Sequence, residues 1–146
     1  MAEFTGELFT HLKAQSAVTS ILGSGTACRL FPDAPRQNAA MPYAFVEQVS
    51  GEASETLSTS LRGSGIEAEL IDVYAVAETK GAAYDLQEAM RLNLHSYRGY
   101  MGSTFVCDCA ITGGIEQGVD RPQDNSDRHR YWCKRTYQFT HLLPTS

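Results

Sequence analysis

The chain has 146 residues, 42% hydrophobic and 20% charged, which predicts one globular domain spanning residues 1–146 and argues against disorder. Twelve Lys and Arg against seventeen Asp and Glu give a net charge of −5, which disfavours a dedicated duplex-DNA binder because such domains carry a basic excess. No apolar run approaches the roughly 18 residues of a membrane span, and the first residues lack a secretion signal. We therefore expect folding in a cytoplasm, with reduced cysteines and no membrane contact.

Two helices are predicted at the start of the chain, over residues 4–12 and 16–22. Apolar residues recur at helical spacing in the first, and Ser16 suits the N-cap of the second. Gly23 is suited to the left-handed conformation that ends a helix. A short strand is expected over residues 27–31, before a proline-rich loop.

Strands and one longer helix are predicted for the middle of the chain. Strands over residues 43–49 and 66–76 flank a Ser-, Thr- and Glu-rich segment, 50–65, which we interpret as a long loop or hairpin. A helix begins at Glu78 or Thr79 and fades within residues 95–99. Its apolar stripe consists of Ala83, Leu86, Met90 and Leu94.

The last part of the chain predicts a long β-hairpin whose polar tip is residues 118–127. One face of its first strand would carry Phe105, Cys107, Cys109 and Ile111. One face of its second strand would carry His129, Tyr131, Cys133, Tyr137 and Phe139. The expected core includes Ile71, Val73, Leu86, Met90, Phe105 and Phe139. The order of elements predicts an α+β single domain: a largely antiparallel sheet, two main helices on one face and a long hairpin.

The sequence carries no catalytic motif: G-x-S-x-G, H-E-x-x-H and the P-loop are all missing. Cys107, Cys109 and Cys133 depart from the spacing of zinc-binding pairs, so we interpret them as core residues rather than metal ligands. Glu67 and Glu69 share one strand face, which we interpret as solvated rather than as a general acid/base pair. We expect no enzymatic activity, no cofactor and no metal.

Residues 128–135 are the strongest candidate for a binding surface. They place Arg128, Arg130, Trp132 and Lys134 on one strand face. Such a face could follow a nucleic-acid backbone and stack on a base. We favour a polar face that pairs with acidic residues of neighbouring strands, or with another subunit. A further hypothesis is a small enzyme or ligand-binding domain, with a pocket walled by Phe105, Tyr131 and Tyr137.

The strings that carry a family resemblance are Arg29-Leu-Phe-Pro32, Met41-Pro-Tyr-Ala-Phe-Val-Glu-Gln-Val-Ser-Gly51, Glu69-Leu-Ile-Asp-Val-Tyr-Ala75 and Tyr137-Gln-Phe-Thr-His141. In their order and spacing the chain resembles the tail-completion or tail-terminator proteins of long-tailed bacteriophages and related prophage-derived particles. The resemblance implies a structural protein that forms a hexameric ring, caps the tail tube, ends polymerisation and offers a docking surface to the head. A head-completion or neck ring protein is the alternative within the same class.

The partners implied by the resemblance are further copies of the chain, the tail tube protein and the head connector or neck proteins. DNA would pass through the lumen only as cargo. The protein would be made and assembled in the host bacterial cytoplasm and would end at the head–tail junction of the virion. Its expected interface residues are Glu52, Glu55, Arg62, Arg121, Asp127, Arg128, Arg130 and Trp132.

Overall fold

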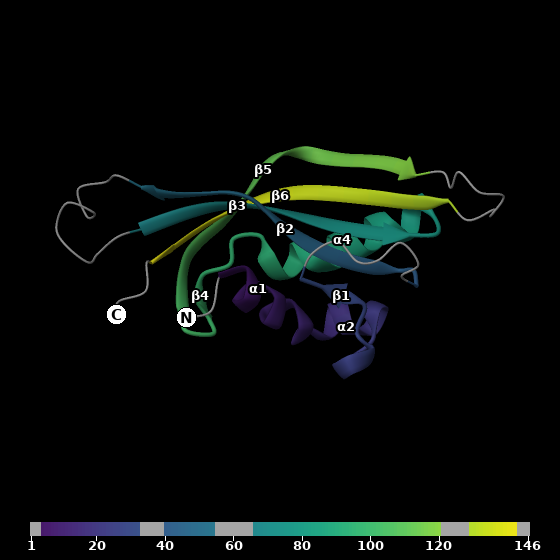
Figure 1. Cartoon of the computed structure of the whole chain (residues 1–146), viewed down its shortest axis with the longest axis horizontal. Helices are drawn as coiled ribbons and strands as arrows, with labels where there is room; N and C mark the ends of the chain where they lie inside the picture. The colour runs from purple at the N-terminus through teal and green to yellow at the C-terminus, as the bar shows by residue number, and fades with distance from the viewer. Residues whose placement is uncertain (1–3, 33–39, 55–65, 121–128, 143–146) are drawn as a thin grey trace.

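The computed structural model describes residues 4–32, 40–54, 66–120 and 129–142. The strands in these ranges form one six-stranded sheet (Figure 1). In spatial order its strands are β1 (Leu30–Phe31), β2 (Tyr43–Ser54), β3 (Ile66–Ala77), β6 (Arg130–Leu142), β5 (Thr104–Asp120) and β4 (Gly99–Met101). Neighbouring strands are antiparallel except for the parallel pair β1–β2. The predicted α+β class with a largely antiparallel sheet is confirmed.

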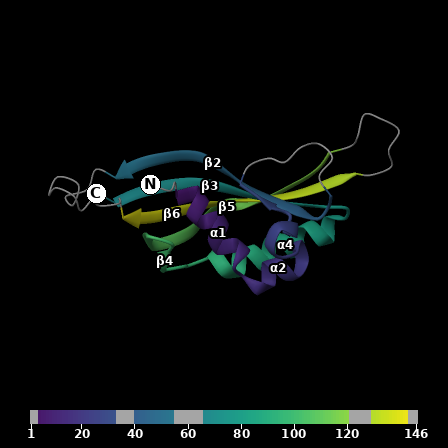
Figure 2. The same ribbon diagram turned by 60° about the horizontal axis from the view of Figure 1, so that its bottom comes forward.

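The helices α1 (Phe4–Lys13), α2 (Ser16–Leu22) and α4 (Lys80–Leu94) all lie on one face of the sheet (Figure 2). All three form where the apolar spacing predicts them. None of the helices in the described part of the chain is long and apolar enough to cross a membrane.

Two details of the first helical segment differ from the prediction. Gln15 is the N-cap of α2, and Ser16 is already its first helical residue. Gly23 has φ +89° but ψ 170°, which lies outside the left-handed helical region. The chain then makes the 3-10 turn η1 (Gly25–Ala27), in which the Cys28 N–H donates to the Gly25 carbonyl. This turn leaves only two residues for β1, fewer than the predicted strand over 27–31.

Helix α4 begins after Thr79, whose side-chain oxygen accepts a hydrogen bond from the Ala82 N–H at 3.1 Å. Its buried residues include the whole predicted stripe: Ala83, Leu86, Met90 and Leu94. Gln87 is buried as well. Its Nε2 donates to the carbonyl oxygens of Val73 on β3 and Cys133 on β6, both at 2.8 Å, and its Oε1 accepts from the Tyr137 hydroxyl at 3.4 Å. One amide therefore joins the helix to both central strands.

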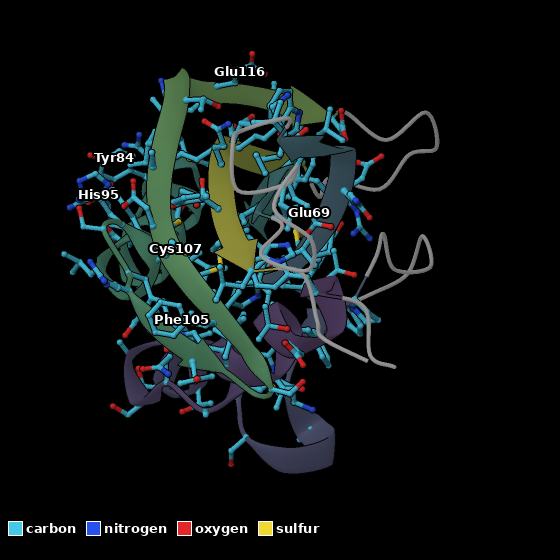
Figure 3. The ribbon with its side chains drawn as sticks, turned by 90° about the vertical axis from the view of Figure 1, so that its left-hand side faces the viewer. Glu69, Tyr84, His95, Phe105, Cys107 and Glu116 are labelled. Atoms are coloured by element: carbon cyan, nitrogen blue, oxygen red, sulfur yellow. The ribbon has the colours of Figure 1, made fainter. Side chains whose placement is uncertain are left out.

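Strand β5 contains an extra residue at Cys107. Val106 is paired with His141 and Asp108 with Thr140, so Cys107 forms a β-bulge that shifts the alternation of side chains. The prediction that Phe105 and Cys107 share a face with Cys109 was therefore wrong. Val106 enters the core, and Phe105, predicted as a core residue, is only half-buried. Figure 3 shows β5 curving from Phe105 through Cys107 to Glu116.

The strands are longer than predicted at both loops. Strand β2 continues to Ser54, past a bulge at Val49, so the predicted loop over 50–65 is strand in its first five residues. Strand β5 continues to Asp120 after a second irregularity around Gly113, which has φ +75°. The predicted hairpin tip therefore loses residues 118–120 to the strand. Residues 55–65 and 121–128 lie outside the described part of the chain.

Replacement of Leu86 by Ala is expected to lower the free energy of unfolding by about 2–5 kcal/mol, because the side chain is fully buried and leaves a cavity. Urea unfolding measures this change. Leu92→Ala is the matched control, since Leu92 lies on the same helix with 72% of its surface exposed. Equal effects of the two substitutions would contradict the packing described for α4.

Replacement of Gln87 by Met keeps the volume but removes the three hydrogen bonds that Gln87 makes to the sheet. We expect a loss of about 1–3 kcal/mol in unfolding free energy, because the buried Tyr137 hydroxyl loses its acceptor. Gln138→Met, at an exposed position of β6, is the control. A Gln87→Met protein as stable as the unmodified one would show that these bonds contribute nothing net.

Candidate interaction surface

The sheet face opposite the helices carries a row of aromatic side chains. This aromatic row crosses four strands and consists of Phe31, Tyr43, Phe45, Tyr74 and Trp132. The rings of Phe45 and Tyr74 are stacked with centroids 4.6 Å apart and planes 8° apart. The Tyr74 and Trp132 centroids are 6.3 Å apart. Contacts of this kind favour a continuous, ordered apolar surface.

Strand alternation places these rings on the uncovered face. On β2, Ala44 and Val46 point into the core, so Tyr43 and Phe45 point the other way. The register then sets Phe45 directly opposite Tyr74. The row therefore follows from the pairing of the strands.

Trp132 covers the backbone of Gly118, its partner on β5. A Cβ atom at position 118 would overlap the indole ring. Only glycine allows the indole to lie this close to β5. Trp132 consequently holds the far half of β5 against β6.

The two cations described beside the aromatic row, Lys134 and Arg130, have anionic or aromatic partners. Lys134 Nζ lies 2.8 Å from Glu116 Oε2 and 3.7 Å from Asp72 Oδ2, and the hydrogen bond to Glu116 raises the pKa of Lys134. Arg130 donates to the Tyr43 hydroxyl at 3.1 Å, and its guanidinium lies 5.7 Å from that ring. Cations that are already paired release few counterions from a phosphate backbone. The geometry therefore favours a polar face paired with neighbouring strands rather than a nucleic-acid-binding surface.

The structure describes three of the eight predicted interface residues. Trp132 lies at one end of the aromatic row beside Tyr74, and Arg130 lies over the Tyr43 ring on the same face. Glu52 lies on β2, opposite Ala68 of β3. The remaining five, Glu55, Arg62, Arg121, Asp127 and Arg128, lie outside the described residues, and their role stays a prediction.

The cysteines do not assemble a metal site. Cys109 is opposite Phe139 and Cys133 is opposite Gln117, far apart along the β5–β6 pair. Burial raises the pKa of the Cys109 thiol to about 12 and also raises that of Cys133, so both stay protonated. Among the described residues no group of three His, Cys, Asp or Glu side chains could hold a metal ion. Cys107, predicted as a core residue, is half-buried because it forms the bulge.

The interpretation of Glu69 as a solvated side chain was wrong. Glu69 lies on the helix-covered side of β3 with 8% of its surface exposed, and its Oε2 is 3.3 Å from His141 Nε2. Figure 3 shows Glu69 on the inner side of the curled sheet. The His141 ring stacks on Phe4 of α1 with centroids 4.5 Å apart. The missed signal is the alternation of β3, which puts Glu69 on the same face as the core residues Ile71 and Val73. The Glu67 side chain is outside the described part.

The three residues of the hypothetical ligand pocket are not brought together. Tyr137 is buried in the core and Tyr131 packs against it. The bulge turns Phe105 away, against Tyr100 at 5.1 Å and the Arg98 guanidinium at 6.0 Å. The aromatic row remains the surface best suited to binding a partner.

Comparison with known proteins identifies the family. Residues 6–106, more than half of the chain, match the family Tail completion protein gp17. No curated protein matches the sequence. A chain from the virion of a native gene transfer agent (GTA) particle shares the fold with a TM-score of 0.68 at 8% identity, over 95% of this chain and 94% of that chain. The protein therefore belongs to the tail completion protein gp17 family, a family of non-enzymatic virion structural proteins.

Proposed function

We propose that the protein forms a hexameric ring that caps the tail tube, ends tail polymerisation and provides the docking surface for the head. The family match over residues 6–106 carries this proposal. The fold shared over nearly the whole chain with a virion protein supports treating residues 1–146 as one tail-terminator-like domain. The ring would lie at the head–tail junction after assembly in the host bacterial cytoplasm.

A closed ring needs two different patches on each subunit, because every copy contacts the next head to tail. The sheet offers such patches, since its two outer edges belong to different strands (Figure 1). Its two faces also differ, because the helices cover only one of them (Figure 2). Tail tube protein would bind one end of the ring and neck proteins the other. The net charge of −5 suits a lumen through which DNA slides, because like charge repels the phosphates.

Solution mass by light scattering, over a range of protein and salt concentrations, tests the ring. We expect the mass of six 16.0 kDa subunits, either for the free protein or once tail tubes are added. Isolated head connectors are the second ligand. A ring that binds connectors and ignores tubes would indicate a neck protein, and a monomer under every condition would contradict the proposal.

Substitution of Arg130 or Trp132 by Ala is expected to weaken ring assembly more than it weakens folding. Trp132 packs on Gly118 and Arg130 contacts Tyr43, both on the uncovered face. The checks are ring mass and thermal unfolding of the same samples. Arg98→Ala is the control, because Arg98 also lies over an aromatic ring but outside the aromatic row. Unchanged rings in both variants would remove this part of the face from the interface.

A further inference from the structure

We propose that the subunits of the ring join edge to edge, with β5 of one copy pairing with β2 of the next to make a sheet that continues through the assembly. This inference rests on the proposed ring and names the contact that would hold it together. The partner is a second copy of this chain.

The outer edge of β5 is largely unpaired. Strand β4 pairs only with Thr104–Val106, and the Ser96 N–H donates to the Cys109 carbonyl at 2.8 Å. From residue 110 to 120 the outer backbone groups have no partner among the described residues. Free backbone donors and acceptors along a strand are a template for pairing with another chain.

The opposite edge of the sheet is open over a similar length. Strand β1 pairs with β2 only at Ala44 and Phe45. Over residues 46–54 no strand in the described part of the chain lies outside β2. Each subunit therefore presents two unpaired strand edges on opposite sides of one sheet.

The strand directions suit a contact between these two edges. β2 is antiparallel to β3, β3 to β6 and β6 to β5, so β2 and β5 run in opposite directions. A second copy in the same orientation, displaced along the strands so that its residues 46–54 lie beside residues 110–120, would continue the antiparallel alternation. Because the two edges differ, the contact is heterologous and repeats from copy to copy until the ring closes.

The side chains of both edges permit pairing. Residues 110–120 and 46–54 contain no Lys, Arg or Pro, and Lys and Pro are among the residues that natural proteins use to block edge pairing. Val119 on β5 and Val49 on β2 are 37% and 55% exposed. Glu116 is compensated by Lys134 within its own subunit. Glu47 and Glu52 on one edge and Asp120 on the other are like charges, so pairing should strengthen as salt screens them.

Two lysine substitutions test the contact. Val119→Lys blocks the β5 edge and Val49→Lys blocks the β2 edge, and Leu92→Lys on the exposed side of α4 is the control. Each edge variant alone is expected to drop from ring mass to the mass of one subunit, and the control is expected to keep the ring. An equimolar mixture of the two edge variants retains one intact edge of each kind. It should therefore form dimers and stop there.

The outcomes separate the contact from the ring itself. Rings formed by both edge variants, beside rings of the unmodified protein, would overturn edge pairing and leave the ring in place. An unmodified protein that stays a monomer even with tail tubes would overturn the ring and the contact together.

Hydrogen exchange on the unmodified protein is a second test, which does not depend on how the variants fold. Amides in 110–120 and 46–54 should gain protection in the ring, and unchanged exchange there would overturn the pairing.

Discussion

The packing of α4 across the two central strands positions the rest of the molecule. Its apolar stripe is fully buried, and Gln87 adds hydrogen bonds to the backbone of both β3 and β6. Those bonds prevent the helix from sliding along the strands, because a displaced helix would leave a buried amide without partners. β3 and β6 form the centre of the sheet, so β2 and β5 depend on them for position and curvature.

The two faces of the sheet differ because the helices cover only one of them. On the covered side the Glu69–His141 contact and Phe4 attach α1 to the ends of β3 and β6. On the other side Lys134 and Arg130 are each held by a partner from a neighbouring strand, so the described cations beside the aromatic row are paired. A surface of that kind suits protein contacts, which are enriched in aromatic residues and depleted in Lys at their centre.

Much of the fold could be predicted from local patterns, and the departures have specific physical causes. Helix α4 and the alternation of β6 are continuous periodic patterns, so their buried residues are evident from the sequence. A bulge adds one residue without changing composition, so Cys107 reversed the expected faces of Phe105 and Val106. The Arg130–Lys134 face was predictable from alternation. Its partners Tyr43 and Glu116 come from other strands, and only the register shows that they meet it. Which strands have an open edge depends on the order of the strands in the sheet, and the periodicity of the sequence does not reveal that order.

Trp132 is the only tryptophan in the chain, and it lies half-buried on the uncovered face beside Tyr74. The intrinsic fluorescence excited at the red end of the protein absorption band therefore comes from the Trp132 indole alone. Its indole touches Gly118, two residues from the end of β5, so a partner bound at that end would alter the polarity around the fluorophore. The protein thus carries its own optical label at the surface where assembly is expected.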